Sequence, residues 1–207
     1  YPLRRQRQMC IRDRRTVEQL LGIEINYTFK VGFDTVTDLV DALSGVDVNV
    51  EPGYATNSFA ALSGFSVHEG VNHLNGEQAL AFARERYSYT EGDRQRTNNQ
   101  QQVLMGIVKE ATKPSVITNY AAIMDTMANT FSTTMSNAEI TDLIKYQLNN
   151  NPTWKMEQYM VDGTGDTLMC AELGDAASVM VPDQSTVKMA KDKINAVLAG
   201  KSSEDVK

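Results

Sequence analysis

Apolar positions recur along the chain with two periods, and each period predicts one kind of secondary structure. Residues 33–45 place apolar side chains at helical spacing, at Phe33, Val36, Leu39, Val40 and Leu43. Residues 46–51, VDVNVE, alternate strictly, which is typical of a strand with one buried face. Residues 23–31 are β-branched and aromatic and also alternate, so they predict another strand. The order strand, helix, strand indicates a βαβ unit in an α/β fold.

Capping residues and apolar spacing predict further elements along the rest of the chain. The expected helices are 16–22, 75–83, 93–111, 115–128, 136–149 and 182–198. Within residues 93–111 the expected core side comprises Val103, Leu104, Ile107 and Val108. Strands are expected at 155–161 and 177–181, with a turn at 162–166 after the first. Residues 52–66 are rich in Gly, Ser, Asn and Pro, and they predict a loop long enough to be functional.

Composition and charge place this pattern in a soluble, acidic protein with one unusual end. The 207 residues fit one domain, and the net charge of −6 argues against nucleic acid and anionic membrane surfaces as partners. Residues 1–15 carry a net charge of +5, whereas the remainder carries −11. We therefore expect residues 1–15 to be a basic leader, either disordered or foreign to the fold, with the foreign origin preferred. The fold is expected over residues 16–200, followed by a disordered tail at 201–207.

Cysteine and histidine add little to this picture. Cys170 is interpreted either as a small buried hydrophobe or as a cysteine whose partner lies elsewhere, and it predicts no redox chemistry. His68 and His73 have no cysteine or carboxylate at metal-binding spacing, so surface or core positions are favoured over zinc ligation. The sequence contains no dinucleotide-binding glycine motif, no P-loop and no nucleophile elbow.

After residue 15, arginine occurs only within one short stretch, residues 84–96. Outside that stretch, the chain after residue 15 uses lysine in place of arginine. The stretch begins with Arg84 and Arg86, which converge on one face if the chain leaves the helix 75–83 in extended form. Arg94 and Arg96 follow at the start of the next predicted helix.

A helical stripe carries the second half of this stretch. Asp93, Arg96 and Gln100 are spaced i, i+3 and i+7, which places them on one side of a helix. Arg94 lies about 160° away from Arg96 around that helix and is not part of the stripe.

Arginines beside a helix N-terminus are well suited to bind phosphate. Guanidinium donates forked hydrogen bonds that match phosphate oxygens, and the helix end adds N–H groups and a favourable dipole. Asp93 is interpreted either as an orienting partner for an arginine or as a ligand and base near the phosphate. The alternative for the whole stretch is a set of solvated ion pairs with Glu85, Glu91 and Asp93, each worth ~0–1 kcal/mol. Tyr87 and Tyr89 either line the site or belong to the core.

The stretch resembles the signature region of a known family. Residues 67–104, VHEGVNHLNGEQALAFARERYSYTEGDRQRTNNQQQVL, closely resemble that of the LytR-CpsA-Psr proteins, with the specific spacing R-x-R…GD-x-x-R-x-x-x-Q. Residues 17–50 are similar to the preceding stretch of the family, and residues 154–200 to the tail of its clostridial-type members.

The resemblance implies an enzyme on the extracytoplasmic face of the cytoplasmic membrane. Such enzymes transfer an anionic glycopolymer, of the wall teichoic acid or capsular polysaccharide type, from a polyprenyl-pyrophosphate carrier to peptidoglycan as a phosphodiester. The implied fold is α/β, with a mixed central β-sheet flanked by helices, a hydrophobic pocket for the lipid and Mg²⁺ at the pyrophosphate. The implied catalytic residues are Arg84, Arg86, Asp93 and Arg96, and the substrate-binding residues are Arg84, Arg86, Arg96 and Gln100.

The sequence also departs from the family pattern. The family's N-terminal membrane helix, its Mg²⁺-binding acids and its Arg-Asp pair on an early strand have no counterparts here. We therefore expect the N-terminal part of the domain, with the anchor and the metal ligands, to be missing and this portion to be inactive by itself. The alternatives are a polyprenyl-pyrophosphate phosphatase, a non-catalytic lipid-binding or wall-binding module and a LytR-type transcriptional attenuator. The acidic body disfavours the last of these because DNA binding needs basic surface.

Overall fold

The computed structural model describes residues 2–117, 131–170 and 174–206. The chain divides into two compact units. One unit comprises Tyr27–Met156, and the other comprises Tyr1–Asn26 together with Glu157–Lys207.

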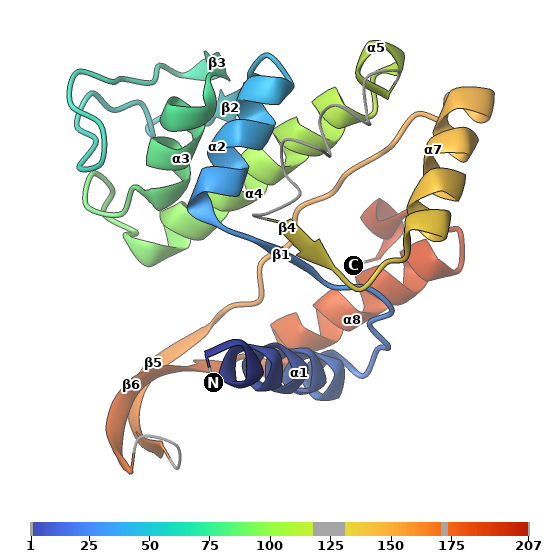
Figure 1. The fold of residues 1–207 in the computed structure, drawn as a ribbon. Helices are drawn as coiled ribbons and strands as arrows, with labels where there is room; N and C mark the ends of the chain where they lie inside the picture. The colour runs from blue at the N-terminus through green and yellow to red at the C-terminus, as the bar shows by residue number, and fades with distance from the viewer. Residues whose placement is uncertain (1, 118–130, 171–173, 207) are drawn as a thin grey trace. The chain divides into compact units, whose positions relative to one another are not determined.

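The Tyr27–Met156 unit contains most of the helices and two strand pairs. Its elements are β1 (Phe29–Val31), α2 (Phe33–Ala42), β2 (Val46–Val50), β3 (Gly70–Leu74), α3 (Gly76–Arg84), α4 (Asp93–Ala111), α5 (Pro114–Ile117), β4 (Phe131–Thr133) and α7 (Asn137–Asn150). Figure 1 shows α2, α3 and α4 gathered beside the β2–β3 pair, and these elements contact one another. The helices 75–83, 93–111 and 136–149 are confirmed, each within one residue of its predicted ends.

The core of this unit lies between β2–β3 and the helices. Strand β2 buries every second side chain, as its alternation predicts, and pairs antiparallel with β3 in a register that sets Val46 opposite Leu74. Helix α4 approaches β2 so closely that a Cβ on Gly106 would lie 2.8 Å from the carbonyl oxygen of Asp47. The absence of a side chain at Gly106 therefore sets how closely α4 packs against the sheet.

The predicted βαβ unit is wrong, although the α/β class is confirmed. Strand β1 pairs antiparallel with β4, and β2 pairs antiparallel with β3, so β1 and β2 lie in different sheets. In the part of the chain that the structure describes, the strands form three two-stranded sheets and no continuous central sheet. The periodicity of a strand indicates which face it buries but not which strand it pairs with. The strand predicted at 23–31 is also shorter than expected, since only residues 29–31 are paired.

The buried side of α4 differs from the predicted one. Val103 is buried and Ile107 is partly buried, as expected, but Leu104 is 60% exposed. The rest of the buried stripe is formed by Gln95, Asn99, Gly106 and Glu110. The predicted helix 115–128 begins as α5, and residues 118–130 lie outside the described part of the chain.

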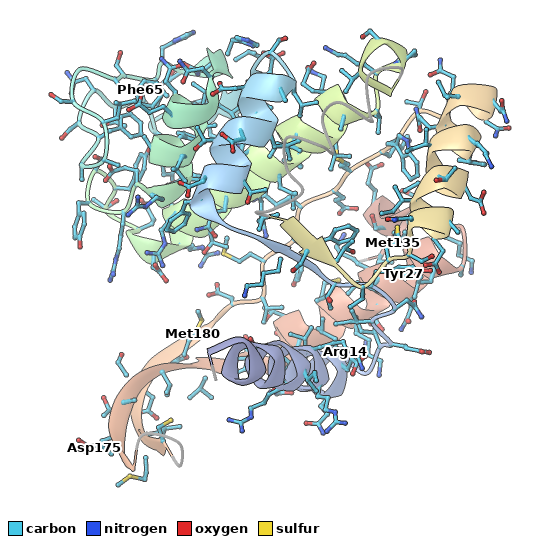
Figure 2. All side chains as sticks on the ribbon, in the orientation of Figure 1. Arg14, Tyr27, Phe65, Met135, Asp175 and Met180 are labelled. Atoms are coloured by element: carbon cyan, nitrogen blue, oxygen red, sulfur yellow. The ribbon has the colours of Figure 1, made fainter. Side chains whose placement is uncertain are left out.

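The second unit combines two helices with a long hairpin. Its elements are α1 (Pro2–Leu21), β5 (Gly163–Cys170), β6 (Asp175–Pro182), α8 (Gln184–Leu198) and the 3₁₀ turn η1 (Ser203–Asp205). Helix α1 packs against α8, and β5 pairs antiparallel with β6 along eight residues. Figure 2 labels Met180 and Asp175 on β6, where both side chains are exposed.

Helix α1 includes residues 2–15, which continue into residues 16–21. The Ser203 carbonyl accepts a hydrogen bond from Lys193 Nζ at 2.8 Å, and the Ser203 hydroxyl bonds to Glu157. The foreign or disordered leader and the disordered tail both stay predictions, whereas one strand expected in this unit is corrected. The strand predicted at 155–161 is absent. Residues 163–170 form the strand instead, including most of the predicted turn, because they are the residues that face β6.

Candidate functional site

The first arginine pair lies where α3 ends. Asn75 caps the start of α3 by accepting a hydrogen bond from the Gln78 backbone N–H at 3.0 Å, and Arg84 is its last residue. The next residue, Glu85, is extended, with φ −66° and ψ 130°. The chain thus leaves this helix in extended form, the condition under which Arg84 and Arg86 converge. Arg84 and Arg86 are exposed on either side of Glu85, which is only 2% exposed.

The carboxylate of Glu85 is satisfied entirely by backbone N–H groups. Its Oε1 accepts hydrogen bonds from the N–H groups of Arg86 at 3.0 Å, Tyr87 at 2.8 Å and Ser88 at 3.1 Å. Its Oε2 accepts one from Ala60 at 2.8 Å. Burial by itself raises the pKa of Glu85, but the four N–H groups outweigh it and hold the pKa below the ordinary value. Glu85 is therefore a buried anchor of the backbone and not the solvated ion-pair partner that the sequence also allowed.

The second half of the stretch forms the first turns of α4. Asp93 is the first residue of this helix, and its Oδ1 pairs with Nη2 of Arg96 three residues later. This pair favours the orienting role for Asp93. Gln100 follows on the same stripe and is exposed, so it remains available to a ligand.

Arg94 points to different neighbours. The charge of Glu91 raises the pKa of Tyr54, and the charge of Arg94 opposes this shift, so the three groups lie together. Tyr54 also packs against Tyr89, with ring centroids 6.0 Å apart. Tyr89 is thus partly buried, whereas Tyr87 is 83% exposed beside Arg86.

Two inward-facing amides lie on α4 beside the arginines, and one of them joins α4 to α3. Asn99, only 1% exposed, donates from Nδ2 to the carbonyl oxygen of Phe82 at 3.0 Å, and Gln95 donates from Nε2 to Asn99 Oδ1 at 2.9 Å. Just before α4, a Cβ on Gly92 would lie 4.0 Å from the carbonyl oxygen of Arg86. The N-terminus of α4 therefore lies next to the Arg84–Arg86 segment. Sequence reasoning missed both amides, although their i, i+4 spacing was the available signal.

An exposed apolar segment leads to Arg84. The guanidinium carbon of Arg84 lies over the ring of Phe33, 4.7 Å from its centroid, which is a cation–π contact. We call Tyr27, Phe29, Val31 and Phe33 the apolar strip, because they are spaced two apart and are exposed by 41%, 58%, 50% and 60%. Figure 2 labels Tyr27 at the start of this strip.

The loop 52–66 adjoins the arginine segment on another side. Its Phe59 and Phe65 rings stack 4.5 Å apart and are buried in the core. Figure 2 labels Phe65 within this loop. Besides the Glu85–Ala60 bond, the Ser88 hydroxyl donates to the Ser58 carbonyl oxygen. The loop is therefore held both by the packing of its buried aromatic rings and by hydrogen bonds to the arginine segment.

The described residues of the site supply few possible metal ligands. Among the described residues there is no group of three His, Cys, Asp or Glu side chains that could hold one. Mg²⁺ in proteins is usually held by one or two carboxylates together with substrate phosphates and water. Asp93 could supply one such carboxylate, and it is paired with Arg96. His73 is engaged elsewhere, with Nδ1 2.8 Å from Asp47 Oδ1 and Nε2 3.0 Å from the Ser44 carbonyl oxygen. Within residues 2–117, 131–170 and 174–206, none of the helices has the length and apolarity needed to cross a bilayer.

A family model matches most of the chain. The model of the LytR_cpsA_psr family matches residues 10–196. The chain belongs to the LytR-CpsA-Psr family. The match begins inside the basic N-terminal segment, and the origin of residues 1–15 stays a prediction.

Relatives and solved structures agree with this assignment. The chain is 31% identical over 150 residues to the polyisoprenyl-teichoic acid–peptidoglycan teichoic acid transferase TagU of Bacillus mycoides, covering 72% of this chain and 47% of the relative. The chain thus spans about half the length of this relative. It also resembles the crystal structure of B. subtilis TagU, with 25% identity and a TM-score of 0.63, over 89% of this chain and 70% of that one. The structure described as TagT bound to LIIa-WTA shares the fold, with 22% identity and a TM-score of 0.67, over 90% of this chain and 66% of that one.

Proposed function

We propose that the protein transfers an anionic glycopolymer of the wall teichoic acid or capsular polysaccharide type from a polyprenyl-pyrophosphate carrier to peptidoglycan. The full-length protein would act at the extracytoplasmic face of the membrane, held there by an anchor of its own. Similarity to TagU, named as a teichoic acid transferase, supports this class of reaction. Capsular polysaccharide remains the second candidate polymer.

The observation that carries the proposal is the arrangement of three arginines on two abutting segments. Arg84 and Arg86 flank the buried Glu85, and Arg96 rises from the first turn of α4 next to them. Among the described residues, the guanidinium of Arg86 makes no ion pair, so its forked donors are available to a phosphate. The N-terminus of α4 adds its dipole to the same place.

The residues of this chain suit binding of a lipid pyrophosphate. Arg84 and Arg86 would each hold one phosphate through paired N–H donors, and Asp93 would keep Arg96 aimed at the phosphate that is transferred. Gln100 would donate its amide to a remaining oxygen. The apolar strip ends at Arg84 through Phe33, so a prenyl chain along it would deliver its pyrophosphate to the arginines.

The proposed reaction is a displacement at the glycan-linked phosphorus. A sugar hydroxyl of peptidoglycan attacks this phosphorus, and the bond from phosphorus to the bridging oxygen breaks. Lipid phosphate leaves, and the hydroxyl proton ends on that phosphate or in solvent. The arginines act by placing positive charge where negative charge builds up on the phosphate oxygens. Mg²⁺ stays an expectation from the family resemblance, with its ligands expected outside this set, and no step above depends on it.

Transfer assays in the full-length protein test the proposal. Arg84→Ala and Arg96→Ala are each expected to abolish transfer from a polyprenyl-pyrophosphate-linked glycan to peptidoglycan, because each removes a forked phosphate ligand. Arg94→Ala is the matched control and should retain transfer, since Arg94 lies with Glu91 and Tyr54. Turnover at the wild-type rate by either of the first two variants would exclude the assignment.

The same assay without peptidoglycan tests the neighbouring possibilities. Release of the glycan phosphate to water without acceptor would identify a phosphatase, because water can take the place of the sugar hydroxyl at the same site. Tight binding of polyprenyl phosphate without turnover would identify a binding module. DNA retardation at low salt would support an attenuator, which the acidic body disfavours.

A further inference from the structure

Glu85 occupies a position that helix chemistry disfavours. It follows the last residue of α3, where the helix dipole is negative and an acidic side chain is unfavourable. It is also almost completely buried, and a buried charge is costly unless hydrogen bonds compensate for it. Four backbone N–H groups supply this compensation, so the carboxylate is stable only in the arrangement that the structure shows.

This arrangement fixes the backbone that carries Arg86 and that follows Arg84 directly. Adjacent side chains point to opposite sides of an extended backbone, so burial of Glu85 turns Arg86 outward. Arg84 is exposed on the last turn of α3, and its guanidinium is further placed by the ring of Phe33. Three N–H groups converge on Oε1, which locks the backbone of residues 86–88.

The same carboxylate fixes the adjoining loop. Its second oxygen, Oε2, accepts the Ala60 N–H, and the Ser88 to Ser58 hydrogen bond joins the same two segments a second time. The loop backbone at residues 58–60 therefore cannot shift without breaking bonds to the arginine segment. The Glu85 side chain thus links the backbone of the arginine segment to the loop 52–66.

We propose that Glu85 is a positioning residue for the lipid-pyrophosphate site, which holds Arg84 and Arg86 as a preformed fork that favours two linked phosphates over one. This inference rests on the proposed function. A preformed fork loses less side-chain and backbone freedom on binding than two independently mobile arginines do. The gain is realised only by a ligand that engages both arginines at once, so the effect is on selectivity for pyrophosphate over orthophosphate.

Binding of inorganic pyrophosphate and orthophosphate to the full chain, measured by calorimetry, tests this role. Glu85→Gln keeps the size of the side chain but replaces one acceptor oxygen with an amide donor that cannot accept a backbone N–H. It should weaken pyrophosphate binding about tenfold, as expected if roughly one immobilised side chain is released, while orthophosphate binding changes by less than about twofold. The matched control is Glu77→Gln, which removes the same charge from an exposed position on α3 and should leave both affinities unchanged.

The outcomes separate this inference from the function on which it rests. Loss of pyrophosphate binding in an Arg84→Ala, Arg86→Ala double variant, together with wild-type selectivity in folded Glu85→Gln, would overturn the Glu85 role and leave the site intact. No pyrophosphate binding by the wild-type chain would overturn both. An equal loss of pyrophosphate affinity in Glu77→Gln would show that the effect comes from net charge alone. That result would also overturn the Glu85 role.

A second variant covers the case in which Glu85→Gln does not fold. Glu85→Asp keeps the charge but is one methylene shorter, so it cannot reach the N–H groups of residues 86–88 and that of Ala60 together. It should show the same loss of selectivity, with faster amide hydrogen exchange at Ala60 than at Tyr87. Wild-type selectivity in this variant would overturn the proposal.

Discussion

Two strand pairs of this protein are both antiparallel, but the apolar side chains of one are buried and those of the other are exposed. In the β2–β3 pair, Val46 is 0% exposed and Leu74, its partner, is 2% exposed. In the β5–β6 hairpin, Leu168 is 48% exposed and Met180 is 63% exposed. Strand pairing alone therefore does not create a core, because a two-stranded sheet needs another element to cover its apolar face.

The difference matters for the candidate site because only the first pair supports it. Helices α3 and α4 pack on the β2–β3 pair, and the arginines lie where these two helices end and begin. The separation between Arg84 and Arg96 thus depends on the core of that unit. The hairpin carries no arginine.

The largest expected contrast comes from deleting matched leucine side chains. Leu74→Ala should destabilise the Tyr27–Met156 unit by about 2–5 kcal/mol, because it leaves a cavity in the core. Leu168→Ala, the control in the hairpin, should change the free energy of unfolding by less than about 0.5 kcal/mol. Chemical denaturation of both variants measures the contrast, and equal losses would show that the hairpin is covered in solution.

A smaller contrast is expected from matched glycines. A Cβ on Gly76 would lie 2.3 Å from the Thr37 carbonyl oxygen, whereas one on Gly165 has no atom within 4 Å. Gly76→Ala should therefore destabilise by about 1–3 kcal/mol through overpacking. Gly165→Ala should be neutral or slightly stabilising, because the strand tolerates the methyl group. Thermal unfolding of the two variants measures both effects. A Gly76→Ala variant as stable as the wild type would show that α2 and α3 leave room for a methyl group at Gly76.

The smallest expected effect is a pH dependence of the stability of the Tyr27–Met156 unit, which contains β2 and β3. The hydrogen bond to Asp47 raises the pKa of His73 from its ordinary value of about 6.5, so the protonated ring is favoured in the folded state. This stability is fully present below the unfolded pKa and is lost as the pH rises through the raised folded pKa. The melting temperature should fall modestly in that window, and His73→Gln should remove the slope. If the melting temperature of His73→Gln falls with pH as steeply as that of the wild type, another group causes the effect.

The sequence predicted the elements of the site better than their surroundings. The bounds of α4 follow from local periodicity and are confirmed, and the extended exit after Arg84, on which convergence of the first two arginines depends, is present. Glu85 could not be placed from sequence, because a glutamate between two arginines reads as a surface ion pair. Its burial depends on the Ala60 N–H, which tertiary folding brings from 25 residues away.

The same limit applies to the inward amides and the strand partners. Asn99 is buried with its amide bonded to the Phe82 carbonyl oxygen, and Gln95 is buried with its amide bonded to Asn99. No periodicity of apolar residues reveals such partners. The pairing of β1 with β4 joins segments about 100 residues apart along the chain, beyond the reach of local patterns. Roles of individual site residues stay predictions until a ligand is tested.

Three of the four clustered arginines are proposed to bind linked phosphates, and the fourth is not. The most direct test follows the assigned side-chain Nε–Hε signals of the arginines by NMR while inorganic pyrophosphate is added to the chain. Saturable shifts are expected at Arg84, Arg86 and Arg96, with Arg94 and the six arginines of residues 1–15 unchanged. Equal shifts at Arg94, or shifts confined to the N-terminal arginines, would contradict this proposal.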